Sequence, residues 1–201
     1  MKHVNPKITT SAKEIKDLIV AWIVISIAFG IVLRPAGSSI VSTGALGSMA
    51  IAALTVGVGF LLHELAHKVV AQKYRCWAEF RANKMMLVLA LLMSFFGFVF
   101  AAPGAVMIFG RVTRRQNGLI SVAGPMTNIA LAIIFFALSA IGTGGFLGRL
   151  FHIGGYVNAF LALFNMLPFG VFDGKKVYNW SKRVFYSVLG LSLIVFFISL
   201  F

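Results

Sequence analysis

The sequence LLHELAH at residues 61–67 places two histidines, His63 and His67, four positions apart inside a long apolar stretch. In an α-helix, positions i and i+4 lie one turn apart on the same face, so both imidazoles can bind one metal ion. Glu64 directly follows His63 and is placed to act as general base toward a metal-activated water. Two histidines are not enough for a catalytic zinc centre, which needs a third protein ligand and an open position. The third ligand has to come from elsewhere in the chain.

The composition is that of an integral membrane protein. Of the 201 residues, 60% are hydrophobic and 11% are charged, whereas a soluble domain has about 25% charged residues. The mean hydropathy is +0.95. We therefore predict an all-α polytopic membrane protein with about five transmembrane helices, whose 201 residues form a single membrane-embedded domain.

The charges predict how the chain is oriented. Lysine and arginine number 18 against five acids, which gives a net charge of +13. Nucleic-acid binding is one common reason for such a basic composition. Here, however, the basic residues lie between apolar segments, as in cytoplasmic loops beside anionic lipid. We therefore predict a multi-pass protein of the cell membrane with a cytoplasmic N-terminus, the lipid bilayer as a partner, and no nucleic acid.

One apolar segment, residues 85–110, is interrupted by Gly97 and by Pro103-Gly104. Basic residues on both sides of it predict that it enters and leaves the membrane at the cytoplasmic face. We predict a re-entrant element made of a short helix and a returning β-strand, Ala105–Phe109, buried in protein or lining a wet cavity. The alternative is a plain transmembrane helix. The five predicted spans are residues 18–33, 48–74, 118–141, 152–168 and 184–201.

The few acidic residues narrow the choice of the third ligand. Only Glu64 and Asp173 lie in or at the edge of apolar segments. Glu14 and Asp17 fall in a polar N-terminal segment, and Glu79 falls in a basic loop. An ionisable residue at membrane depth is costly and is a candidate for a functional site. Asp173 is therefore the candidate for the missing ligand.

Asp173 reaches the motif histidines if residues 85–110 are re-entrant. In that topology, Asp173 lies at the cytoplasmic end of its span, at the same depth as His63 and His67. We predict one Zn²⁺ bound by these three side chains, inside the membrane toward the cytoplasmic side, with Glu64 as the general base. A zinc-activated water with such a base hydrolyses peptide bonds.

A peptide bond inside a transmembrane helix is protected by the hydrogen bonds of that helix, so the substrate must unwind locally. The edge of the strand Ala105–Phe109, next to the turn at Pro103 and Gly104, can hold an unwound segment by β-augmentation. Asn165 and Asn128 are candidates for donating hydrogen bonds to the substrate backbone or to an oxyanion. Interhelical hydrogen bonding explains both asparagines equally well.

Three blocks occur in order along the chain: HELAH at 63–67, AGPMTN at 123–128, and NMLPFGVFDG at 165–174. Together they resemble the site-2 proteases, a family of intramembrane zinc metalloproteases. The resemblance implies that His63, His67 and Asp173 bind zinc and that Glu64 is the base. It also implies transmembrane protein substrates, as in regulated intramembrane proteolysis. The chain is similar to a minimal prokaryotic or archaeal-type member, but it has Ala66 where glycine is usual and an apolar insert over residues 85–100.

Two other functions fit part of the sequence. Some membrane transporters of zinc or other divalent cations carry a His-Glu-x-x-His run in a transmembrane helix. Transport needs polar residues along a path to the opposite face, and the outer halves of the predicted spans nearly lack them. A catalytically silent metal-binding scaffold would not require both Glu64 and Asp173.

Overall fold

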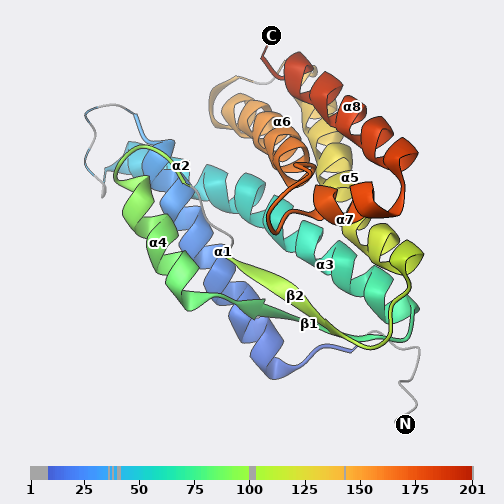
Figure 1. Cartoon of the computed structure of the whole chain (residues 1–201). Coiled ribbons are helices and arrows are strands. Elements are labelled where there is room, and N and C mark those ends of the chain that lie inside the picture. The colour runs from blue at the N-terminus through green and yellow to red at the C-terminus, as the bar shows by residue number, and fades with distance from the viewer. Residues whose placement is uncertain are drawn as a thin grey trace.

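The computed structural model describes residues 9–35, 37, 39, 42–99, 103–142 and 144–200. Helices dominate, and a two-stranded antiparallel sheet lies beside the helix that carries the motif (Figure 1). The elements are α1 (Ala12–Val32), α2 (Thr43–Ala52), the π-helical turn η1 (Ala53–Gly57), α3 (Val58–Lys73), β1 (Trp77–Ala82), α4 (Lys84–Ser94), β2 (Gly104–Phe109), α5 (Arg114–Ser139), α6 (Gly145–Asn165), α7 (Asp173–Trp180) and α8 (Lys182–Ile198).

Among the described residues, four helices are long and apolar enough to cross a membrane: Ala12–Val32, Thr43–Lys73, Arg114–Ser139 and Gly145–Asn165. The helix α8 covers the fifth predicted span with 17 residues, at the lower limit for crossing. The prediction of an all-α polytopic membrane fold is therefore confirmed. Helix α1 begins at Ala12, ahead of the apolar residues 18–33, and the Ser11 hydroxyl caps it by accepting a hydrogen bond from the Glu14 backbone N–H.

Residues 77–109, which follow the motif helix, turn back on themselves through a short helix and a returning strand, as predicted. Strand β1 pairs antiparallel with β2, from Trp77 opposite Phe109 to Ala82 opposite Gly104. Just beyond the sheet, the Asn83 backbone N–H donates to the Pro103 carbonyl at 2.9 Å. Between the strands, α4 has only 11 residues, too few to cross a bilayer, so the alternative of a plain transmembrane helix is wrong.

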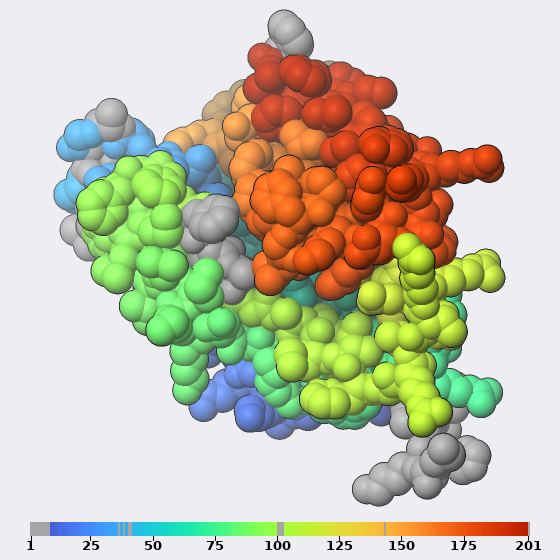
Figure 2. Space-filling model, viewed as in Figure 1, coloured from blue at the N-terminus to red at the C-terminus, as the bar shows by residue number. Residues whose placement is uncertain are grey.

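The prediction of a basic loop around Glu79 is wrong, because this region forms β1. Its pairing partner, β2, lies more than 20 residues further along the chain, so local sequence gives little indication of it. Beyond the sheet, α4 forms a separate ridge at one side of the molecule (Figure 2). Large apolar side chains are exposed on it, among them Met85, Val88, Leu89 and Leu92.

A buried ion pair joins α1 to the motif helix. The Lys68 ammonium lies 2.6 Å from a Glu14 carboxylate oxygen, and neither side chain is more than 1% exposed. The other Glu14 oxygen accepts a hydrogen bond from the Phe80 backbone N–H in β1 at 2.9 Å. Glu14 was predicted to lie in a polar segment, but α1 begins at Ala12 and turns this carboxylate inward. The pair therefore holds α1, α3 and β1 together.

We expect Glu14→Gln to lower the free energy of unfolding by about 3–5 kcal/mol, because it leaves the Lys68 ammonium buried without a counter-charge. Combining it with Lys68→Met removes that charge and should recover much of the loss. Reversible unfolding in mixed detergent micelles measures both effects. Asp17→Asn, on the same helix, is the control and should change stability by no more than about 0.5 kcal/mol. Equal stability of Glu14→Gln and Asp17→Asn would refute the role of the pair.

The remaining helices fix the position of α7. Helices α5, α6, α7 and α8 share a core that includes Ile129, Ala159, Met166 and Val177. Helix α6 ends at Asn165, and the chain stays irregular until α7 begins at Asp173, because Pro168 and Gly170 do not continue a regular helix. A Cβ atom on Gly174 would lie 2.2 Å from the Met166 carbonyl oxygen. This close approach sets the first turn of α7, and hence Asp173, against the end of α6.

Candidate active site

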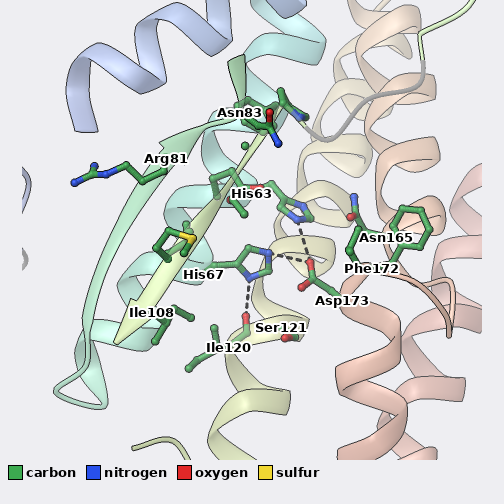
Figure 3. Close-up of a pocket in the computed structure, with 18 of the residues that line it drawn as sticks. His63, His67, Arg81, Asn83, Ile108, Ile120, Ser121, Asn165, Phe172 and Asp173 are labelled. Carbon is green, nitrogen blue, oxygen red and sulfur yellow. Dashed lines mark hydrogen bonds and ion pairs between the residues drawn. The ribbon is translucent and has the colours of Figure 1, made fainter. Parts of the chain in front are cut away.

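The three predicted metal ligands meet in the interior (Figure 3). The Asp173 Oδ2 atom lies 3.3 Å from His63 Nε2 and 2.9 Å from His67 Nε2. The ligand atoms of all three residues lie within 4.8 Å of one another, and all three residues are buried. The two histidines come from successive turns of α3, whereas Asp173 comes from the first residue of α7.

Each histidine is oriented by a carbonyl oxygen from α5. The distance from His63 Nδ1 to the Asn128 amide oxygen is 2.5 Å, and that from His67 Nδ1 to the Ile120 backbone oxygen is 2.7 Å. Because a carbonyl oxygen only accepts, each Nδ1 carries the proton and each Nε2 keeps its lone pair. Such support of the second ring nitrogen is typical of metal-ligating histidines. Two imidazoles and one carboxylate, so arranged, fit a zinc ion.

Gly124 of α5 leaves the space that the two imidazoles occupy. A Cβ atom at this position would lie 2.5 Å from the Nε2 atoms of both His63 and His67. The sequence pointed to this block, but it did not indicate that Gly124 faces the site. The signal was a glycine before Pro125 inside a helix, which by itself indicates only close packing.

The charges around Asp173 suit a metal ligand. Burial raises the pKa of the Asp173 carboxyl, but the adjacent His67 and His63 outweigh burial and hold that pKa below its usual range. A metal ion at this position would bind the carboxylate in its ionised form. Its second oxygen lies 3.4 Å from the ammonium of Lys176, whose side chain is 46% exposed.

The site opens into a cavity of about 760 Å³. Glu64, Pro103, Gly104 and Asn165 line it together with the three metal-ligand candidates. Glu64 faces β2, where its carboxylate interacts with the backbone N–H of Val106. The predicted base, ligands and strand edge therefore lie around one space, with further lining from α5, α6 and α7.

The two predicted asparagines have different surroundings. One N–H of the Asn165 amide donates to the Leu161 carbonyl at 2.9 Å, and the side chain lies at the cavity (Figure 3). Asn128 is fully buried, and its amide nitrogen donates to the Gly59 carbonyl and to the amide oxygen of Asn158. Asn128 therefore makes the interhelical contacts that were its alternative interpretation, and it uses all its donors within the protein.

Fold and site together define a polytopic membrane protein with a buried His-His-Asp cluster whose geometry suits a metal ion. No protein-family model and no solved structure matches the chain. The protein named "Putative zinc metalloprotease MJ0611" of Methanocaldococcus jannaschii is 42% identical over 187 residues, which cover 92% of each chain. "Putative zinc metalloprotease YwhC" of Bacillus subtilis is 30% identical over 146 residues, 62% of this chain and 65% of the relative. The chain belongs to this family of zinc metalloproteases.

Proposed function

We propose that this protein is an intramembrane endopeptidase of the site-2 protease type, which binds one Zn²⁺ and cleaves transmembrane protein substrates. The main support is the meeting of His63, His67 and Asp173 beside Glu64, in a cavity among helices long enough to cross a membrane. The basic loops favour a cell-membrane protein with a cytoplasmic N-terminus and a site toward the cytoplasmic side. The exposed apolar face of α4 suits contact with lipid.

The chemistry follows from the residues around the cavity. A zinc ion held by His63, His67 and Asp173 would act as a Lewis acid, which polarises a carbonyl and lowers the pKa of a water molecule to about 7. Glu64 takes a proton from the attacking water as its oxygen bonds to the scissile carbonyl carbon. Glu64 then delivers that proton to the amide nitrogen as the carbon–nitrogen bond breaks. The products are a carboxylate and an amine, so no other reactant is needed.

One edge of the sheet lines the cavity, where an extended substrate can pair with it. In an antiparallel pair, residues alternate between pointing their backbone groups at the partner strand and pointing them away. The Phe80 N–H and the Ala78 carbonyl point away from β2, toward Glu14 and Gln72. The outer edge of β1 is therefore occupied by the chain's own side chains.

The same alternation applies to β2. Val106 lies opposite Phe80, and Gly104 and Ile108 lie two positions to either side of it. The backbone groups of all three residues therefore point away from β1. All three residues line the cavity, and because the Val106 N–H interacts with Glu64, a substrate that pairs at Val106 has to displace this carboxylate from the strand edge. A substrate segment paired with this edge would place its peptide groups next to the base and the metal ligands. This arrangement supports β-augmentation as the way in which an unwound helix is held.

Glu64→Gln tests the proposal. We expect the purified wild-type protein to cleave a helical membrane substrate and to lose that activity with a chelator. The amide cannot take the proton from water, so the variant should cleave at least about 100- to 10,000-fold more slowly. Its zinc content, measured by mass spectrometry, should equal that of the wild type because Glu64 is not a ligand. Metal flux into liposomes without any cleavage would instead support a transporter.

A further inference from the structure

A chain of buried amides leads from helix α6 to the metal site. Asn158 lies in α6, and its side chain is fully buried. Its amide nitrogen donates to the Gly154 carbonyl at 2.9 Å, and its amide oxygen accepts from the Asn128 amide nitrogen, also at 2.9 Å. Asn128 in turn accepts from His63 Nδ1. Three helices, α6, α5 and α3, are thus joined through side-chain hydrogen bonds that end on a metal-ligand candidate.

Asn158 determines which atoms donate and which accept in this series of hydrogen bonds. The Gly154 carbonyl only accepts, so the Asn158 nitrogen must face it and the Asn158 oxygen must face Asn128. The Asn128 nitrogen then has two acceptors in reach, Asn158 and the Gly59 carbonyl. A flipped Asn128 amide would set its oxygen against both acceptors. The Asn128 oxygen is therefore held toward His63, which requires the proton on Nδ1.

His63 needs this support more than His67 does. The acceptor for His67 is the backbone carbonyl of Ile120, which is fixed in α5 and cannot exchange oxygen for nitrogen. The acceptor for His63 is an amide side chain, which can rotate unless its other contacts prevent it. Water cannot readily replace a lost partner in this fully buried position.

We propose that Asn158 is a positioning residue of the metal site, which keeps His63 in its Nδ1–H tautomer by fixing, together with the Gly59 carbonyl, the orientation of the Asn128 amide. The inference rests on the proposed zinc centre. Gly59 is part of the same arrangement, because a Cβ atom there would lie 2.3 Å from the Asn158 amide oxygen. Close approach of α3 and α6 at Gly59 thus leaves room for the asparagine.

The test compares Asn158→Leu and Asn158→Ala with a matched control, Ser192→Ala. Ser192 is a fully buried polar residue on α8 whose hydroxyl donates to the Val188 carbonyl of the same helix, and it is not among the described residues that line the cavity. Zinc affinity is measured by competition with a chromophoric chelator. We expect both Asn158 variants to bind zinc about 10- to 100-fold more weakly than wild type, and the control to bind normally. If the leucine variant does not fold, the smaller alanine variant carries the test.

Nitrogen-15 NMR of histidine-labelled, zinc-free protein gives a second readout. The wild type should show His63 as the Nδ1–H tautomer, and the Asn158 variants should show a mixture with the Nε2–H form. Lower thermal stability with an unchanged tautomer and unchanged zinc affinity would overturn the proposal and leave Asn158 a packing residue. Absence of zinc binding by the wild type would count against the proposed function itself, before any comparison of variants.

Discussion

Gly124→Ala is expected to abolish zinc binding without unfolding the protein. The added methyl group would lie 2.5 Å from the Nε2 atoms of both His63 and His67. This distance is shorter than a Cβ atom keeps from heavy atoms to which it is not bonded. One imidazole, or α5 itself, has to move, so the two nitrogens no longer converge with Asp173. We expect zinc affinity to fall by more than the roughly 10- to 100-fold that follows loss of a contact supporting a single ligand.

Gly190→Ala is the matched control for this exchange. Gly190 also lies within a long helix, α8, and a Cβ atom there would meet nothing within 4 Å. Alanine suits a helix better than glycine, so the control should fold and bind zinc as the wild type does. Zinc content by mass spectrometry and helix content by circular dichroism are measured on both variants. Wild-type zinc binding by a folded Gly124→Ala protein would show that Gly124 does not set the positions of His63 and His67.

The metal-ligand candidates could be predicted from the sequence because two strong regularities apply to them. The helical period places His63 and His67 on one face whatever surrounds them. The alternation of apolar segments with basic clusters predicts that Asp173 lies at the same depth. Both regularities are spacings along the chain. The structure brings the three residues together in space.

The features that sequence reasoning missed depend on contacts between distant segments. Strand β1 is stable only with β2 as its partner, and the six residues of β1 alone do not reveal that pairing. Glu14 follows basic residues and was interpreted as solvated, because charge counting does not tell which face of α1 turns inward. Asn158 is one asparagine in an apolar helix, with no spacing relative to the motif that would distinguish it from interhelical packing.

Asp173→Ala is expected to remove zinc as well as activity. The variant leaves only the two imidazoles of α3, whereas a catalytic zinc site uses three protein ligands. The loss of zinc affinity should therefore exceed the roughly 10- to 100-fold cost of losing a supporting contact. Helix α7 should stay in place, since the fully buried Val177 and the packing of Gly174 against Met166 do not involve the carboxylate.

Lys176→Met, also on α7, tests whether Asp173 acts as a ligand rather than through its charge pair. The Lys176 ammonium lies 3.4 Å from Asp173 but is half exposed, and such pairs contribute little, so zinc binding should change little. Titration with zinc by calorimetry compares the two variants, and unchanged zinc affinity in Asp173→Ala would remove this residue from the ligand set. Because Glu64→Gln should lose activity with its zinc in place, the contrast with Asp173→Ala separates the base from the ligands within one cavity.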